Sequence, residues 1–136
     1  MTRVNADLDP RDLTRLHLIA EIREITMVAG SLKRSLKSKD VDSVIKRIPE
    51  QFTLNQGHVM FFYDKLDFLR RRFNRLADEM ERRGYSPDRE RIHAFDGFND
   101  KLYNDWTATE DDNDIVRERI RLRISEKPHL YEESNV

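Results

Sequence analysis

Residues 64–83 read DKLDFLRRRFNRLADEMERR, and their apolar side chains recur at spacings of three, four, three and four. The stripe consists of Leu66, Leu69, Phe73, Leu76 and Met80. This period is typical of an amphipathic helix with one buried face. Because glycine readily ends a helix, Gly84 marks its C-terminal stop. We therefore expect a helix that begins at Val59 or Asp64 and ends at Arg83.

The opposite face of this expected helix is rich in arginine. Its members are Arg70, Arg71, Arg72, Arg75, Arg82 and Arg83. Such a run is as typical of a solvated helix surface as of a phosphate-binding one. Charge segregates along the whole chain, because residues 1–83 hold 17 basic and 13 acidic side chains while residues 84–136 hold 8 and 13. A basic patch for a polyanion is compatible with this split, although the pI near 6.4 is low for an obvious nucleic-acid-binding domain.

An earlier helix is expected over about residues 9–38, because Asp9-Pro10 provides an acidic residue and a proline, both suited to a first turn. Its apolar stripe consists of Leu18, Ile22, Ile25, Ala29, Leu32 and Leu36. With about 3.6 residues per turn, His17, Glu21 and Glu24 fall together on a neighbouring face. We expect these three side chains at the surface or in a cleft.

A third helix is expected from Thr109 to about Ser125. Thr109 is followed by three acidic residues, and a threonine cap with first-turn carboxylates satisfies free backbone N–H groups. Residues 117–124 alternate arginine with other, mostly apolar residues, which taken alone is typical of a strand. We favour the helix because no second convincing strand exists to pair with it.

The other segments have the composition of connections. Residues 41–48 can form a short helical turn, and residues 85–109, rich in turn formers and aromatic residues, are expected to be an ordered loop. With 136 residues, of which 38% are hydrophobic, the chain has the size of one domain. We therefore expect an all-α fold: a compact single domain, residues 1–136, of three main helices with long ordered loops.

The composition disfavours several classes of function. The chain has no cysteine, hence no disulfide or thiolate metal site, and no apolar run of about 20 residues that would span a membrane. It has no phosphate-binding glycine loop and no HExxH motif. The histidines are too scattered to indicate a metal site: His17, His58, His93 and His129. His58, beside Gly57 and aromatic residues, is more typical of a structural histidine than of a ligand.

The N-terminus offers one possible nucleophile. Initiator methionine is commonly removed before a small residue, so that Thr2 would present its α-amine. An α-amine has an ordinary pKa of about 7.7 to 8.0, so part of it is neutral at physiological pH and can form a Schiff base with a sugar aldehyde. Taken alone this carries little weight, since many chains begin with Met-Thr.

Residues 57–72, GHVMFFYDKLDFLRRR, closely resemble the central segment of the pyrimidine-dimer DNA glycosylase/AP lyase family, the UV-repair enzymes of the T-even phage type. The similarity extends to MTRVN at residues 1–5, to HLIAEIRE at residues 17–24, and more faintly to residues 119–131. The resemblance implies a mostly helical DNA repair enzyme that acts as a monomer on cyclobutane pyrimidine dimers in double-stranded DNA. It also implies a cytoplasmic or nucleoid location and no cofactor, metal or membrane partner.

The resemblance further implies roles for single residues. Thr2, through its α-amine, would attack the anomeric carbon of the 5′ nucleotide of the dimer and form an imine. Glu24 would be the catalytic carboxylate that stabilises the cationic sugar and assists the proton transfers of β-elimination. Such a carboxylate suits an oxocarbenium-like transition state in a water-poor cleft. The remaining implied site residues would contact the substrate DNA: Arg3, His17, Arg23, Arg119, Arg123 and Tyr131.

The chain also departs from the family pattern. Ile25-Thr26-Met27 stands where the family continues its basic site with an arginine, and in residues 127–133 only Tyr131 matches an aromatic residue of a basic tail. One inserted residue, near the acidic residues 7–10, could move the terminal amine relative to Glu24. Two alternatives therefore stay open. The chain could use the same imine chemistry on another modified pyrimidine or on abasic sites only, or it could be a catalytically idle helical DNA-binding or interaction module.

Overall fold

Three long helices dominate the computed structural model, which describes residues 3–131. They are α1 (Arg15–Leu36), α4 (Leu66–Arg82) and α5 (Glu110–Glu126). No residue of the described range lies in a β-strand. The expected all-α fold of three main helices is therefore confirmed, and residues 117–124 are helical despite their alternating pattern.

Shorter helical elements fill much of the remaining chain. In chain order they are η1 (Pro10–Asp12), α2 (Val41–Lys46), α3 (His58–Phe61), η2 (Arg89–Phe95), η3 (Asp100–Leu102) and η4 (Pro128–Leu130). The short helical turn expected over residues 41–48 is thus present. None of the helices in the described part of the chain is both long and apolar enough to cross a bilayer.

α1 begins later than the sequence indicated, because two residues that can cap a helix, Asp9 and Thr14, follow each other closely. Asp9 caps only the 3-10 turn η1, where its side chain accepts a hydrogen bond from the backbone N–H of Arg11. Leu13 is then extended, and the Thr14 side chain accepts a hydrogen bond from the backbone N–H of His17. A side-chain cap at that position starts a new helix, so the expected start near residue 9 is wrong by about one and a half turns.

α4 also begins later than expected, at Leu66 rather than at Val59 or Asp64. The residues before it form the separate helix α3, and Lys65 has a non-helical backbone with φ −127° and ψ 42°. The C-terminal end agrees with the sequence, because Gly84 has φ +91° and the N–H of Tyr85 bonds the carbonyl of Met80 over 2.9 Å. This left-handed glycine ends the helix as expected.

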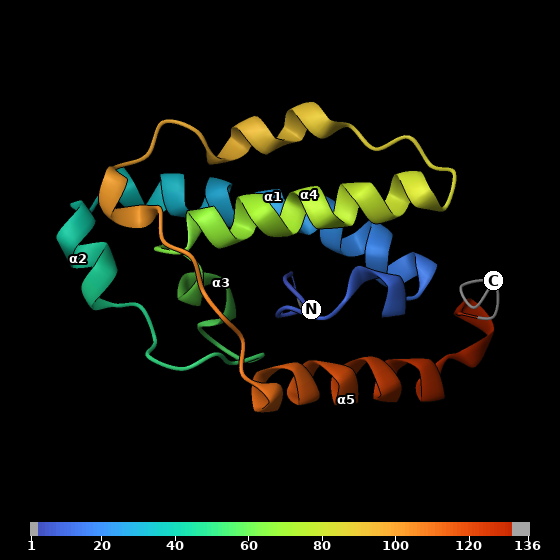
Figure 1. The fold of residues 1–136 in the computed structure, drawn as a ribbon. Helices are drawn as coiled ribbons and strands as arrows, with labels where there is room; N and C mark the ends of the chain where they lie inside the picture. Colours follow the sequence, from blue (N-terminus) through green and yellow to red (C-terminus); the bar gives the residue numbers. More distant parts are fainter. Residues whose placement is uncertain (1–2, 132–136) are drawn as a thin grey trace.

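α1 and α4 pack side by side in opposite directions, and η2 packs against both (Figure 1). α5 runs along the other side of this pair, and the N-terminal segment, residues 3–9, lies between α5 and the α1–α4 layer (Figure 1). The expected apolar stripe of α1 is buried except for Leu36, which is partly buried against the core. Within α5, Val116 is the buried residue. The α1–α5 contact is therefore looser than the α1–α4 contact.

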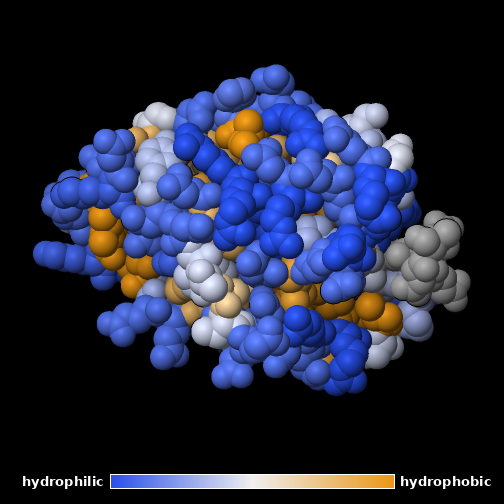
Figure 2. Space-filling model, viewed as in Figure 1, coloured by the Kyte–Doolittle hydropathy of each residue, from blue (hydrophilic) through white to orange (hydrophobic). Residues whose placement is uncertain are grey.

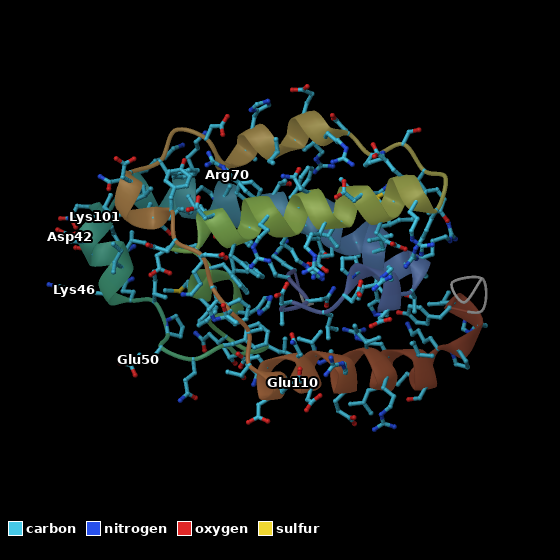
Figure 3. The ribbon with its side chains drawn as sticks, in the orientation of Figure 1. Asp42, Lys46, Glu50, Arg70, Lys101 and Glu110 are labelled. Atoms are coloured by element: carbon cyan, nitrogen blue, oxygen red, sulfur yellow. The ribbon has the colours of Figure 1, made fainter. Side chains whose placement is uncertain are left out.

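Residues 85–109 form an ordered loop, as the sequence indicated. Tyr103 donates a hydrogen bond to the carbonyl of Phe95 over 2.6 Å, and the Trp106 ring stacks on Phe52 with centroids 5.6 Å apart. Lys101 of η3 forms a 3.0 Å ion pair with Asp42 of α2 (Figure 3). Hydrophilic residues cover most of the face shown in Figure 2, and apolar residues reach it in small areas, one of them just above α5.

Candidate active site

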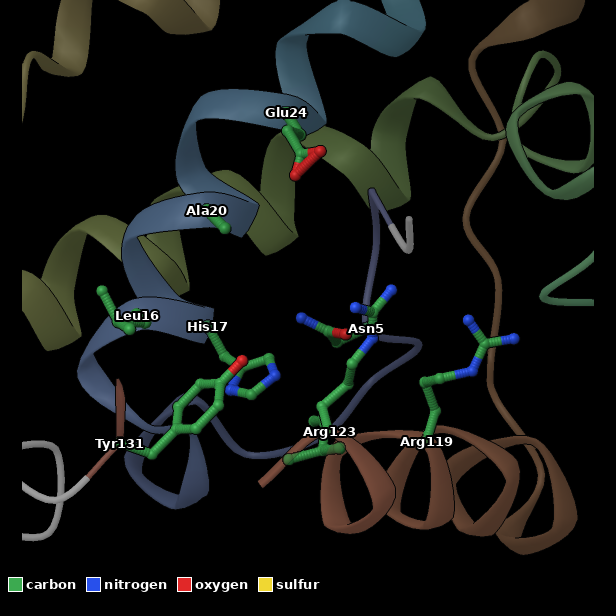
Figure 4. Close-up of a pocket in the computed structure, with 9 residues that line it drawn as sticks. Asn5, Leu16, His17, Ala20, Glu24, Arg119, Arg123 and Tyr131 are labelled. Carbon is green, nitrogen blue, oxygen red and sulfur yellow. The ribbon is translucent and has the colours of Figure 1, made fainter. Parts of the chain in front are cut away.

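A cleft of about 320 Å³ lies between α1 and α5 (Figure 4). It is lined by Asn5, Leu16, His17, Ala20, Glu24, Arg119, Ile120, Arg123 and Tyr131. Five of the eight residues that the sequence suggested for a site are in this lining: His17, Glu24, Arg119, Arg123 and Tyr131. These five side chains are up to 114 positions apart in the chain.

Glu24 projects from α1 into this cleft and is half-buried (Figure 4). Its Oε2 atom is buried and has no hydrogen-bond partner within the described residues. Burial raises the pKa of Glu24, while the positive charge of Arg3 acts in the opposite direction. A buried carboxylate oxygen without a partner is costly, and carboxyl groups with raised pKa values in a cleft are typical of functional sites.

Two arginines face Glu24 from the opposite wall of the cleft. Arg119 and Arg123 lie one turn apart on α5; both side chains rise from the helix, and that of Arg123 ends beside Asn5 (Figure 4). Neither side chain forms a hydrogen bond or an ion pair with another residue of the range 3–131. By contrast, Arg117 pairs with Asp114 over 2.6 Å and Arg121 pairs with Glu118. α5 therefore presents two uncompensated positive charges to the cleft.

His17 and Tyr131 close one end of the cleft by stacking. Their ring centroids are 5.0 Å apart and their planes differ by 13°. The Nδ1 atom of His17 lies 2.6 Å from the hydroxyl of Thr14, the residue that caps α1. Burial, and then the charge of Arg123, lowers the pKa of His17 from its ordinary value of 6.5. His17 is consequently neutral at pH 7.

Beneath the cleft lies a buried ionic network that the sequence did not indicate. Glu21 and Arg72 are both fully buried and form a bidentate ion pair with N–O distances of 2.8 and 2.9 Å. Asn5, a lining residue of the cleft, donates its amide to Glu21 over 2.8 Å. The expectation of Glu21 at the surface or in a cleft is therefore wrong, because its guanidinium partner comes from α4 and lies in the core. All three residues belong to stretches that resemble the family, but no local pattern indicates their pairing.

The remaining expected site residues lie elsewhere. Arg3 lies near Glu24, but its guanidinium is 2.9 Å from the sulfur of Met27. Arg23 is exposed and lines a second groove on the other side of α1 together with Arg91 and Tyr85, so the structure does not bring it to the cleft. Thr2 lies outside the described residues.

Carboxylates occupy the arginine-rich face of α4. Arg70 pairs with Asp96 and Arg71 with Asp105, each over 3.0 Å. Arg75 reaches Asp7 over 2.7 Å. Arg82 and Arg83 both contact Glu79 over 2.6 Å, and Arg72 is in the core. The solvated-surface interpretation therefore holds for the exposed Arg71 and Arg82 but not for Arg72, and the phosphate-binding one stays a prediction that requires DNA to displace these carboxylates.

His58 is structural, as the sequence indicated. It is buried, its Nδ1 atom is 2.8 Å from the carbonyl oxygen of Thr53, and its Nε2 atom accepts a 3.3 Å hydrogen bond from the backbone N–H of Val4. Within residues 3–131, no group of three or more histidine, aspartate or glutamate side chains is arranged to hold a metal ion.

Comparison with known protein families assigns the chain. A family model described as pyrimidine dimer DNA glycosylase matches residues 1–93, which is more than half of the chain. The matched part contains Glu24, His17 and the buried Glu21–Arg72 pair, whereas α5 and its two unpaired arginines lie beyond it. On this match, the chain belongs to the pyrimidine dimer DNA glycosylase family.

Proposed function

We propose that the chain cleaves the glycosidic bond of the 5′ nucleotide of pyrimidine dimers in double-stranded DNA through an imine and then cleaves the strand by β-elimination. The α-amine of Thr2 is the nucleophile and Glu24 is the catalytic carboxylate. The observation that carries the proposal is the buried, unpartnered Oε2 of Glu24 opposite the unpaired Arg119 and Arg123. A carboxylate in such a place can stabilise a cation, and two guanidinium groups without carboxylate partners can bind an anion.

The proposed steps assign each bond and proton. The amine nitrogen attacks the sugar C1′, and the bond from C1′ to the pyrimidine breaks with its electron pair going to the base, which takes up a proton from water. Glu24 passes one proton of the resulting ammonium to the ring oxygen O4′, the bond from C1′ to O4′ breaks, and the open sugar carries a protonated imine, which acidifies the C2′ proton. Glu24 accepts that proton, and the 3′ phosphate leaves. The raised pKa of Glu24 suits these proton transfers, since a carboxyl that titrates closer to neutrality exchanges protons more readily.

The other lining residues serve the DNA strand in this proposal. Arg119 and Arg123 bind phosphates beside the reacting sugar, where both guanidinium groups can make charge-assisted hydrogen bonds. Arg3 binds a phosphate next to the nucleophile. The stacked rings of His17 and Tyr131 contact the substrate at one end of the cleft. Arg23 binds the DNA strand on the other side of α1.

Borohydride trapping tests the proposed chemistry. The protein is incubated with duplexes that contain a dimer, an abasic site or no damage, and borohydride reduces any imine to a stable covalent complex. We expect complexes with the first two duplexes and none with the third. A complex with the abasic duplex alone identifies an abasic-site lyase, and the absence of any complex identifies a catalytically idle module. A duplex with another modified pyrimidine, included in the panel, tests the alternative substrate.

The variant Glu24→Gln tests the role of the carboxylate. We expect excision to fall by about 100- to 10,000-fold, the usual contribution of a positioned acid or base. Duplex binding should stay within about threefold, because the carboxylate acts on the transition state. Glu118→Gln, which removes an exposed glutamate outside the cleft, is the matched control. Loss of binding with intact turnover of the bound complex would contradict the assignment.

The mass of the purified chain tests the nucleophile itself. A mass that lacks the initiator methionine means that the Thr2 amine is free to react. A mass that retains it means that this nitrogen is in an amide and cannot form an imine. In that case trapping with dimer duplex must fail if Thr2 is the nucleophile.

A further inference from the structure

The N-terminal segment, residues 3–9, is bound by side chains of several helices. The backbone N–H of Val4 donates to His58 of α3 over 3.3 Å, and that of Asp7 donates to Asn113 of α5 over 3.0 Å. The carboxylate of Asp7 accepts a 2.7 Å hydrogen bond from Arg75 of α4. Arg3, the first residue of this segment, directly follows Thr2 in the sequence.

The most buried of these contacts come from the Glu21–Arg72 pair. Both side chains have no exposed surface, and Arg72 holds Glu21 in bidentate fashion. The pair also binds the segment at two points. Glu21 accepts the amide of Asn5 over 2.8 Å, and Arg72 donates to the carbonyl of Leu8. The ion pair is thus a bridge from α1 and α4 to the N-terminal segment.

Stability alone does not explain an ion pair in this place. Removing two charges from water costs so much that apolar replacements of a buried pair are often neutral or stabilising. Apolar side chains could therefore hold α1 against α4, but they could not bind the Asn5 amide or the Leu8 carbonyl. Between these two points Ala6 has φ +50°, a left-handed backbone that is unfavourable for a residue with a Cβ atom. Such a conformation persists where surrounding contacts enforce it.

The bridge also lies next to the proposed catalytic glutamate. Glu21 is one turn before Glu24 on α1, and Asn5 lines the same cleft as Glu24. We propose that Glu21 and Arg72 are positioning residues, which set the start of the chain, and hence its amine, at a fixed distance from Glu24. This inference rests on the proposed imine chemistry and adds to it the residues that align its two reacting groups.

The double variant Glu21→Met with Arg72→Met tests the inference, because it removes the bridge without leaving a buried charge unpaired. We expect it to fold, with a thermal midpoint lowered only by the Asn5 amide and the Leu8 carbonyl, which lose their partners. Its single-turnover rate of imine trapping on dimer duplex should fall by about 100-fold, the usual cost of a misplacement of about 1 Å. Its Kd for the same duplex should change by less than about threefold, since the free arginines of the cleft remain. If the pair were merely structural, its loss would not lower the trapping rate while leaving the Kd nearly unchanged.

A second readout does not depend on activity. Hydrogen exchange at the amides of Val4 and Asp7 should be faster in the double variant, because the segment has lost two of its anchors. The matched control is Glu81→Gln with Arg89→Met, which removes an exposed ion pair that makes no hydrogen bond to the segment. This control should trap imine at the wild-type rate and leave both amides as protected as before.

The variant Asn5→Ala keeps the inference testable if the double variant does not fold. It leaves the Glu21–Arg72 pair intact and removes only one anchor, so it should show slower trapping and faster exchange at Val4 without a large loss of stability. Wild-type trapping rates or unchanged amide exchange in a folded bridge variant would overturn the positioning role. A wild-type protein that gives no covalent complex with any damaged duplex would instead overturn the proposed function.

Discussion

Two helices of this protein carry many arginines. Those of α4 are ion-paired, whereas the two on the cleft face of α5 have no carboxylate partner among the described residues. Every arginine of α4 contacts a carboxylate, and the partners come from several parts of the fold. Arg119 and Arg123 of α5 contact none among the residues described. An ion-paired guanidinium must give up its partner before it binds a phosphate, whereas an unpaired one need not. Carboxylate partners, more than arginine counts, therefore locate the anion-binding surface.

The contrast has a simple structural origin. α4 lies in the middle of the fold, so the N-terminal segment, α1 and the loop after η2 all bring acidic residues to it. α5 lies at the edge, and three of its acidic residues, Glu110, Asp114 and Glu118, pair within the helix with Arg117 or Arg121. Glu24 is the acidic residue in the lining of the facing cleft.

The largest expected effect is on the buried arginine of α4. Arg72→Met removes the partner of a fully buried glutamate, and leaving one buried charge alone typically costs about 3 to 5 kcal/mol of stability. The measurement is the urea midpoint of unfolding at pH 7, with the double Glu21→Met, Arg72→Met variant as the comparison. A loss below about 1 kcal/mol would mean that Glu21 finds another partner or takes up a proton.

The next effect concerns DNA binding by the unpaired arginines. Arg119→Ala with Arg123→Ala should raise the Kd for duplex DNA by roughly tenfold per side chain, the usual worth of a charge-assisted hydrogen bond. The slope of log K against log salt should become shallower by about 1.8, since each lost phosphate contact contributes about 0.9. Arg117→Ala with Arg121→Ala removes the same charge from the outer face and is the control. Equal slopes for the two double variants would remove the distinction between paired and unpaired arginines on α5.

Local patterns were sufficient to predict the three long helices, because periodicity and caps are properties of neighbouring residues. The stripe of α4, Gly84 and the Thr109 cap are in the structure as expected, and the capping box with Asp112 explains why α5 is helical despite its alternating pattern. The start of α1 was predicted wrongly because Asp9 and Thr14 are both good caps, and sequence alone does not rank them.

The site was partly predictable. The resemblance indicated His17, Glu24, Arg119, Arg123 and Tyr131, and the fold brings them into one cleft. Local patterns could not predict which charges meet across the fold. Glu21 and Arg72 are 51 positions apart, and their pairing depends on how α1 packs against α4. Arg23 is adjacent to Glu24 in sequence, yet a helix turns about 100° per residue, which places it in the other groove.

A small effect is expected for the exposed arginines of α4. Arg70→Ala with Arg71→Ala breaks the pairs with Asp96 and Asp105, which are both near the surface. Exposed pairs are worth about 0.2 to 1 kcal/mol each, so stability should fall only slightly, and the salt slope of DNA binding should not change. A slope that becomes shallower by about one unit per arginine would mean that DNA does displace these carboxylates, and the contrast with α5 would then fail.

The smallest effect tests whether the charge of Arg123 changes the pKa of His17 in the cleft. Burial first and Arg123 second lower the pKa of His17 below its ordinary 6.5, so the folded protein binds this proton less readily than the unfolded chain. The contribution of neutral His17 to stability is therefore present above pH 6.5 and is lost as the pH falls through the folded pKa.

Arg123→Ala should raise the His17 pKa part of the way back and reduce this acid-induced loss, as NMR titration and unfolding at several pH values can measure. Arg121→Ala should leave both unchanged, because Glu118 already balances that charge. If the two variants shift the pKa of His17 equally, the charge of Arg123 acts on the cleft no more strongly than that of the ion-paired Arg121.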